Sequence, residues 1–277
     1  MTDVPSSPAP PPKRKQLRVV NRGKRFAMPR TITALILREM STTYGRSPGG
    51  YLWALAEPIL GIALLTAIFS IGFRSPRLGD NFPIFYATGL LPYLFFVDVS
   101  TKTAQAVNYS KQLLAYPRVT LIDAVLARFI LSVLTQLMVS YVLLTAILWA
   151  FETRTTLEVD RILMTYLMAM ALGLGVGVFN CFLMTMFPVW QRAYNVLTRP
   201  LLLVSGVIFI YETIPRPYKE WLWWNPLMHV TGEMRGAFYI SYDALYVTPS
   251  YVFGFSAIFG AIGLLFLWRY YRDIMEL

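Results

Sequence analysis

The chain has 277 residues and an apolar composition, with 56% hydrophobic and only 14% charged residues. A soluble domain carries about 25% charged residues, so the composition excludes an ordinary soluble protein. The net charge of +10 would by itself suit nucleic acid or anionic lipid as a partner. The positions of the cations, described below, favour orientation in a lipid bilayer and argue against nucleic acid.

The N-terminal segment, residues 1–29, is predicted to be a cytoplasmic tail. Residues 1–12 are rich in Pro and Ser and should be disordered, and the rest is basic and suited to anionic headgroups. The first 30 residues contain no apolar run typical of a cleavable signal peptide. Residues 31–44 then show the spacing of a short amphipathic helix, which the Pro-Gly-Gly sequence at 48–50 ends.

Six long apolar stretches follow, and their length indicates helices that cross a bilayer. A hydrocarbon core needs roughly 20 apolar residues in a helix, and in lipid only helices or closed barrels satisfy the backbone. The stretches are too uniformly apolar for the alternating strands of a barrel. The sequence therefore predicts an all-α membrane protein with six transmembrane helices, at about residues 52–73, 82–100, 129–150, 162–187, 196–210 and 250–270.

The lysines and arginines are distributed unevenly over the connections between these stretches. Ten lie in residues 1–50, eight lie in the other proposed cytoplasmic segments, and seven lie in the proposed external segments. Cytoplasmic loops carry the excess of Lys and Arg in membrane proteins. We therefore expect a multi-pass protein with both termini in the cytoplasm.

Two connections differ from ordinary loops. The cytoplasmic connection 101–120 contains a predicted short helix at 104–116, which Pro117 ends. The external connection 211–249 has an aromatic and apolar centre at 220–240 that Asn225-Pro226 interrupts. An apolar run of this length cut by Asn-Pro favours two short re-entrant or interfacial helices over a seventh span.

Candidate chemistry within the chain is sparse. The only histidine, His229, has Glu233 one helical turn later, but two ligands make a poor metal site, so no metal is expected. Gly173, Gly175 and Gly177 lie within an apolar stretch, where small residues favour close helix packing. The single cysteine, Cys181, is interpreted as a packing residue. The chain contains no G-x-x-x-x-G-K-[ST] sequence, so any ATP that drives it must bind another polypeptide.

Acidic residues within the predicted spans are limited to Glu57 and Asp98, both near cytoplasmic ends. A secondary transporter would bury ionisable groups near the middle of the membrane, so the sequence disfavours this alternative class. A membrane-embedded enzyme, such as a transferase of lipid-linked sugars, would need clustered acids or a metal site. Glu57 and Asp98 are therefore interpreted as structural or coupling residues.

The chain has 42 aromatic residues (7 Trp, 17 Tyr and 18 Phe). Trp and Tyr at span ends usually form the interfacial belt, and others fill the core. Aromatic rings with polar edges also suit a path along which a sugar chain slides. Seven residues are candidates for such a path, with belt or core as the alternative: Tyr86, Tyr93, Phe95, Phe96, Phe182, Trp190 and Tyr194.

Three segments of the chain resemble the type-2 ABC exporter permeases for polysaccharides. Residues 35–60 (LILREMSTTYGRSPGGYLWALAEPIL) resemble the amphipathic interface helix and the start of the first span in that family. Residues 108–128 (NYSKQLLAYPRVTLIDAVLAR) resemble its cytoplasmic coupling region, and residues 223–239 (WWNPLMHVTGEMRGAFY) its external re-entrant helices. Within the family the chain is most similar to capsular polysaccharide exporters; O-antigen and teichoic-acid permeases share these features.

The resemblance implies a homodimeric permease in the bacterial inner membrane, with residues 30–277 as its transmembrane domain. Two copies of a separate ABC ATPase would bind ATP and Mg, and this chain would hold no cofactor. The cargo would be a lipid-linked polysaccharide passed on to a periplasmic co-polymerase and an outer-membrane channel. The residues that would couple to the ATPase are Arg38, Glu39, Tyr44, Arg46, Asn108, Lys111, Tyr116 and Pro117. Those that would form an external gate are Trp223, Asn225, Pro226, His229, Glu233 and Arg235.

Overall fold

The structure is a computed structural model that describes residues 27–43, 50–114, 119–152, 155 and 157–276. Within these ranges the regular elements are all helices, which confirms the predicted all-α class. In chain order they are α1 (Ala27–Thr43), α2 (Gly50–Gly72), α3 (Phe82–Ala104), α4 (Ala106–Leu114), α5 (Leu121–Ala150), α6 (Val159–Met186), α7 (Pro188–Val204), the 3-10 turn η1 (Tyr211–Thr213), α8 (Tyr218–Trp223), α9 (Pro226–Phe238), α10 (Pro249–Arg269) and α11 (Tyr271–Glu276).

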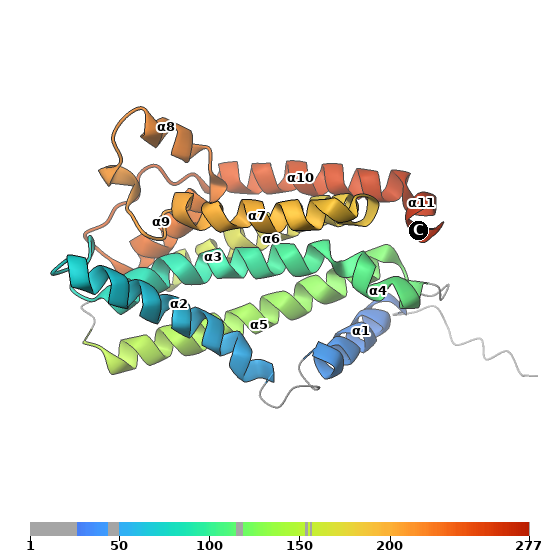
Figure 1. The fold of residues 1–277 in the computed structure, drawn as a ribbon, viewed down its shortest axis with the longest axis horizontal. Coiled ribbons are helices and arrows are strands. Elements are labelled where there is room, and N and C mark those ends of the chain that lie inside the picture. Colours follow the sequence, from blue (N-terminus) through green and yellow to red (C-terminus); the bar gives the residue numbers. More distant parts are fainter. Residues whose placement is uncertain (1–26, 44–49, 115–118, 153–154, 156, 277) are drawn as a thin grey trace, which may run out of the picture.

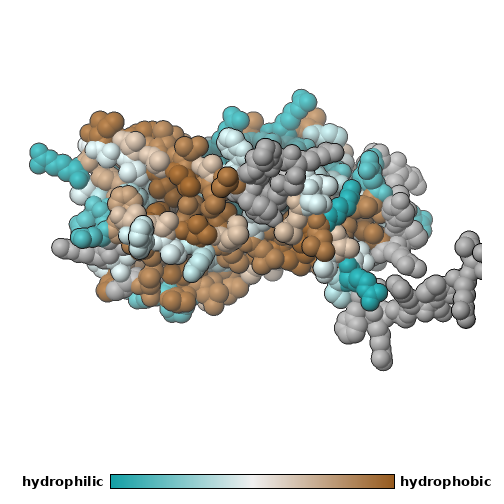
Figure 2. Space-filling model, turned by 90° about the horizontal axis from the view of Figure 1, so that it is seen from below, coloured by the Kyte–Doolittle hydropathy of each residue, from teal (hydrophilic) through white to brown (hydrophobic). Residues whose placement is uncertain are grey.

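The long helices lie side by side as one bundle. Figure 1 shows α3, α5, α6, α7 and α10 lying along the long axis of the molecule, with α2 tilted against them. α1, α4 and α11 lie at one end, and α8 and α9 lie toward the other. In Figure 2, hydrophobic residues cover much of one face of this bundle, and most strongly hydrophilic residues lie toward its ends or edges. An apolar waist between polar ends is the surface expected of a protein that spans a bilayer.

Five helices in the described part of the chain are long and apolar enough to cross a membrane. Their candidate spans are Leu52–Gly72, Phe82–Leu114, Leu121–Ala150, Val159–Met186 and Pro249–Arg269. They correspond to five of the six predicted stretches, although the third begins at Leu121 and not near residue 129. Thr120 and Asp123 fix that earlier start with a capping box, in which each side chain accepts a hydrogen bond from the other's backbone N–H.

The remaining predicted stretch, residues 196–210, does not coincide with one helix. α7 starts at Pro188 and ends at Val204, and residues 205–210 then turn without helical structure. Gly206 has a φ of 74°, a conformation that glycine adopts without strain. With 17 residues that include Arg192 and Arg199, α7 is shorter and more polar than the five spans, so a sixth crossing stays a prediction.

Helix α6 forms the centre of the bundle and packs along α3 and α10. A Cβ atom at Gly173 would come within 2.7 Å of Val99 Cγ1, and one at Gly177 within 2.7 Å of Thr103 Cβ. Because no side chain fits between these backbones, the glycines allow α3 and α6 to approach closely. This confirms the interpretation of the glycine run as a packing surface.

Candidate coupling and gating sites

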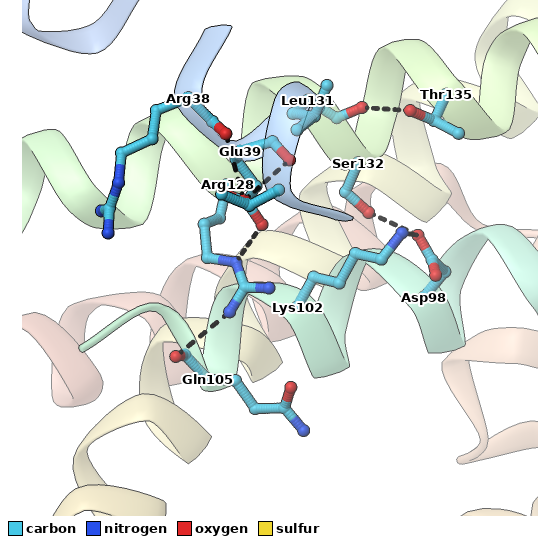
Figure 3. A network of polar contacts seen from close by, with 10 residues as sticks. Arg38, Glu39, Asp98, Lys102, Gln105, Arg128, Leu131, Ser132 and Thr135 are labelled. Atoms are coloured by element: carbon cyan, nitrogen blue, oxygen red, sulfur yellow. Dashed lines mark hydrogen bonds and ion pairs between the residues drawn. The ribbon is translucent and has the colours of Figure 1, made fainter. Parts of the chain in front are cut away.

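Arg128 of α5 joins three separate segments at the end of the bundle where α1 and α4 lie. Its Nε donates to Glu39 Oε1 of α1 at 2.7 Å, and a terminal N–H donates to the carbonyl of Gln105, between α3 and α4, at 3.3 Å (Figure 3). The guanidinium carbon also lies 4.1 Å from the ring centroid of Tyr109 on α4. We call Glu39, Gln105, Tyr109 and Arg128 the Arg128 network.

The ion pair in this network is largely shielded from water. The Arg128 side chain is 6% exposed and the Glu39 side chain 15% exposed. Breaking a buried pair is costly because it leaves one charge buried without its partner. The network therefore fixes the position of α1 relative to α4 through one side chain.

A second group of polar side chains, Asp98, Lys102 and Ser132, lies at the same end of the bundle. Ser132 follows Arg128 by about one turn of α5. Lys102 Nζ lies 3.0 Å from Asp98 Oδ2, and the Ser132 hydroxyl of α5 donates to the same Asp98 oxygen at 2.6 Å (Figure 3). Asp98 is thus held by both α3 and α5. These contacts give the carboxylate a structural partner, in line with the interpretation of this residue from the sequence.

The predicted coupling residues fall into three groups. Glu39 belongs to the Arg128 network, whereas the Arg38 side chain points away from it and is exposed (Figure 3). Asn108 and Lys111 are exposed on α4, where another protein can reach them. The other four, Tyr44, Arg46, Tyr116 and Pro117, lie outside the described residues.

Arg128 itself was not among the coupling residues predicted from the sequence. The available signal was a cation followed by 22 residues of apolar helix, since a charge at a membrane helix requires a partner. The identity of that partner was not readable, because Glu39 is 89 positions away in the chain.

His229 clamps the opposite end of the bundle. We call residues 205–248, which include η1, α8 and α9, the α8–α9 cap. The buried His229 ring accepts the backbone N–H of Thr248 at Nδ1 (3.1 Å), and its Nε2 lies 2.8 Å from the carbonyl of Trp223. Nδ1 accepts, so Nε2 carries the proton and donates. Burial lowers the pKa of His229, which favours this neutral form.

Arg235 ties α9 to the segment after α7. The residue is 2% exposed, and its terminal nitrogens donate to the carbonyls of Phe209 (2.6 Å) and Val207 (2.9 Å). Its guanidinium carbon also lies 4.3 Å from the Phe85 ring centroid on α3. Arg235 thus satisfies carbonyls that the turn at 205–210 leaves without helical partners.

Asn225 explains why the cap contains two helices. Its Oδ1 accepts the N–H of Leu227 at the start of α9, while its Nδ2 donates to the carbonyl of Val204 at the end of α7. Asn is a favoured N-cap residue and Pro226 suits the first turn. The predicted break at Asn225-Pro226 is confirmed as the boundary between α8 and α9.

His229 and Glu233, one helical turn apart, do not share a hydrogen bond, because both His229 ring nitrogens have backbone partners. Burial raises the pKa of Glu233, and the nearby Arg161 partly opposes that shift. Trp223 supports the clamp by donating its indole N–H to the Tyr246 carbonyl at 3.3 Å. Among the described residues, no group of three His, Cys, Asp or Glu side chains is placed to hold a metal ion.

The seven aromatic path candidates pack inside the helical bundle. Tyr93 donates to the Thr198 carbonyl at 2.8 Å, Tyr194 shares a hydrogen bond with Ser100, and Trp190 donates to Asn180. Six of the seven are buried and Trp190 is partly buried, so in this conformation the rings fill the core and do not line an open route. The buried six are Tyr86, Tyr93, Phe95, Phe96, Phe182 and Tyr194.

The described residues thus form a bundle of long apolar helices with short helices at both ends, an architecture typical of multi-pass membrane proteins. Residues 30–239 match the ABC-2 type transporter family, and the chain belongs to that family. It is 32% identical over 238 residues to the polysialic acid transport protein KpsM of Escherichia coli, covering 84% of this chain and 91% of the relative.

Two further relatives are capsule polysaccharide export inner-membrane proteins. The chain is 25% identical over 224 residues to CtrC of Neisseria meningitidis serogroup B, covering 80% of this chain and 84% of CtrC. It is 24% identical over 225 residues to BexB of Haemophilus influenzae, covering 78% of this chain and 83% of BexB. The similarity therefore extends over most of the bundle in all three comparisons.

Proposed function

We propose that this protein is the permease subunit of an ATP-driven exporter that moves lipid-linked capsular polysaccharide outward across the bacterial inner membrane. The observation that carries the proposal is the similarity to capsule export permeases over about four-fifths of the chain. A polar polymer cannot cross lipid unaided, because each hydroxyl would lose its hydrogen bonds to water. A protein-lined route replaces some of them.

In this proposal the chain crosses the membrane six times, with α7 as the fifth crossing and both termini in the cytoplasm. At about 1.5 Å per residue, the 17 residues of α7 extend roughly 26 Å, and residues 205–210 add further length. α1 and α11 lie at the same end of the bundle (Figure 1), as two cytoplasmic termini require. The excess of cations in the connections at that end supports the same orientation.

The ATP-binding partner docks at the α1 and α4 end. Two ATPase subunits would act on a homodimer of this chain, with ATP and Mg bound by the partner. α1 and α4 would move together because Arg128 links them, and the exposed Asn108 and Lys111 would contact the partner. A periplasmic co-polymerase and an outer-membrane channel would continue the route.

The α8–α9 cap would act as the external gate, and the aromatic rings would line the route only after the helices separate. Engineered cysteine pairs between the two protomers within α9 would test the gate. If a disulfide between the α9 helices of the two protomers leaves export unchanged, the cap does not act as a gate.

The function itself is tested by expressing the chain with the ATPase encoded beside it in an export-deficient strain. We expect the two proteins to co-purify and to restore surface polysaccharide, and disabling the ATP site of the partner should abolish that restoration. Co-purification without surface polysaccharide would contradict the substrate assignment. A chain that exports without any ATPase would contradict the ABC mechanism.

A further inference from the structure

A large hollow lies over α6, between the first turns of α5 and most of the length of α10. It has a volume of about 750 Å³. Of the side chains that line it, only those of Thr120, Ser256 and Tyr271 carry a hydroxyl group, and none is charged. We call it the α10 groove. Its apolar lining suits a hydrocarbon occupant, and it is separate from the Arg128 network and from the α8–α9 cap.

Small residues create this hollow. Ala257, Gly260 and Ala261 share the face of α10 that lines it, and Ala171 and Gly175 of α6 lie on its floor. A Cβ atom at Gly260 would meet its nearest neighbour, the Gly175 Cα, at 3.5 Å, which is ordinary contact distance. The groove therefore has room for added atoms. Side chains around an unfilled hollow lose dispersion contacts, which an occupant of matching shape restores.

The groove has the length and shape of a site for a flexible chain. Along α10 it extends from Phe253 to Trp268, which is roughly 22 Å. One leaflet of the hydrocarbon core is roughly 15 Å thick. α5 lines the groove only with residues between Leu121 and Leu126, so the groove has two walls at the end near α4 and α11. It can thus hold a chain that reaches from that surface to the middle of the membrane.

The residues at this end suit an anionic headgroup. Trp268 and Tyr271 line the end of the groove and are exposed, and such rings lie at headgroup level in membrane proteins. The next residue in the chain after each of them is an exposed arginine, Arg269 or Arg272. The exposed Asp273 offsets only one of these charges. Basic sites between membrane helices on the cytoplasmic side bind the headgroups of anionic lipids.

We infer that the α10 groove holds the acyl chains of an anionic phospholipid from the cytoplasmic leaflet, with its headgroup at Arg269 and Arg272. The inference rests on the orientation given under the proposed function, and the lipid is a resident of the membrane and not the exported cargo. Such a lipid would join α5 to α10, whose side chains form the two walls of the groove. Because α5 also carries Arg128, an occupied groove would stabilise the helix on which the Arg128 network is built.

Photocrosslinking tests the site on the full chain in nanodiscs of phosphatidylethanolamine. A trace of phosphatidylglycerol with a photoreactive acyl chain is added, and in a parallel sample phosphatidylcholine with the same chain. Three exposed residues of α10 that line the groove each have an exposed neighbour in the chain that does not line it. Phosphatidylglycerol should label the groove residues about fivefold more than their neighbours, and phosphatidylcholine should not. The pairs are Ala257 and Ile258, Ala261 and Ile262, and Leu264 and Leu265.

Two glycines of α10 provide a matched pair of variants. G260L places a side chain in the groove, whereas G254L adds the same side chain at an exposed position where a Cβ atom meets nothing within 4 Å. G260L should lose the groove labelling and the rise in unfolding temperature that phosphatidylglycerol gives the wild type, and G254L should keep both. R269Q/R272Q should lower the ratio of phosphatidylglycerol to phosphatidylcholine labelling about fivefold, and R269K/R272K should retain it.

Four outcomes would overturn the inference. Equal labelling of the groove residues and their neighbours would mean that only bulk lipid covers this face. Equal labelling by the two lipids would mean that the arginines bind no anionic headgroup. Groove labelling that appears only in membranes that make the polysaccharide would assign the groove to the lipid of the cargo. A photoreactive amino acid in place of Ala261 that crosslinks in native membranes to a protein, and not to lipid, would make the groove a docking site for a helix.

The export function is measured separately on the wild-type chain, through co-purification with the ATPase and recovery of surface polysaccharide. If labelling shows no preference for the groove while the wild type still exports, the inference fails and the function stands. If the groove is labelled as expected but the wild type neither binds an ATPase nor exports, the function fails and the lipid site stands.

Discussion

The two ends of the bundle hold their short helices in different ways. Among the α1 residues with described side chains, none is buried, and the Arg128 network is the polar link from this helix to α4 and α5 described above. In α9, nearly every residue from Leu227 to Phe238 is buried, and His229, Asn225 and Arg235 bind backbone groups on three sides. Regions with few buried contacts open at low free-energy cost. The α1 end is therefore suited to move on the bundle, whereas the α8–α9 cap has more buried contacts and opens at a higher free-energy cost.

The largest loss of stability is expected at Arg235. R235M keeps most of the side-chain length but removes the donors to the carbonyls of Val207 and Phe209. Leaving buried acceptors without partners should lower the free energy of unfolding by about 3 kcal/mol. Thermal unfolding in detergent measures the change, with exposed Arg216 as the control. If R235M and R216M unfold alike, the cap is not held by Arg235.

Loss of Arg128 should cost less stability but remove more function. R128M leaves Glu39 without its partner, and because Glu39 is partly exposed and can rehydrate, we expect a loss of about 2 kcal/mol. Export should fall strongly while the protein remains folded, since α1 and α4 no longer move together. The comparison of unfolding temperature with surface polysaccharide checks this, with exposed R30M as the stability control. A variant that exports normally would remove Arg128 from the coupling path.

His229 should make an intermediate contribution within the cap. H229F fills the space but removes one accepted and one donated hydrogen bond, so we expect a loss of about 1–2 kcal/mol. The same unfolding measurement tests the value. An unchanged midpoint would show that the ring contributes by packing alone.

The His229 clamp should also depend on pH. Burial lowers the pKa of His229 below its ordinary value of 6.5, so below about pH 6.5 the unfolded chain binds the proton first. Protonation of the unfolded state then lowers stability as the pH falls, and the native form is unaffected above that range. Wild type should lose more stability than H229Q between pH 7.5 and 5.5. Equal losses would show that other groups cause the acid sensitivity.

The smallest effect is expected at Ser132. S132A removes one hydrogen bond to Asp98, which keeps Lys102 as a partner. We expect a loss of about 0.5–1 kcal/mol in unfolding free energy. A loss as large as that of R128M would mean that the Asp98 group, and not the Arg128 network, holds this end together.

Much of the fold could be predicted from the sequence because the length and apolar character of a membrane-spanning helix can be read from consecutive residues. Five spans follow from uninterrupted apolar runs, and the break at Asn225-Pro226 follows from helix capping. The boundary of the fifth apolar stretch, predicted at residues 196–210, was wrong because the polar residues around Arg192 and Arg199 interrupt the apolar pattern from which a span is read. Their polar neighbours share one stripe of the helix, so α7 continues through them from Pro188 to Val204.

The contacts at the two candidate sites could not be predicted in the same way. Arg128 meets Glu39 across 89 residues, and Arg235 meets Val207 across 28. Such pairs depend on how helices pack, which a single sequence does not specify. The aromatic candidates show the same limit, because a ring that suits a sugar path also suits a core, and these rings are in the core.

The most direct test of the account is a charge exchange between Glu39 and Arg128, with export and ATPase activity measured on the complex with its ATPase. We predict that E39R and R128E each uncouple ATP hydrolysis from export, and that the double variant E39R/R128E recovers a substantial part of the coupling, because the pair is re-formed with reversed charges. If the double variant is no better than either single variant while all three assemble with the ATPase, the contact between α1 and α5 does not transmit the movement.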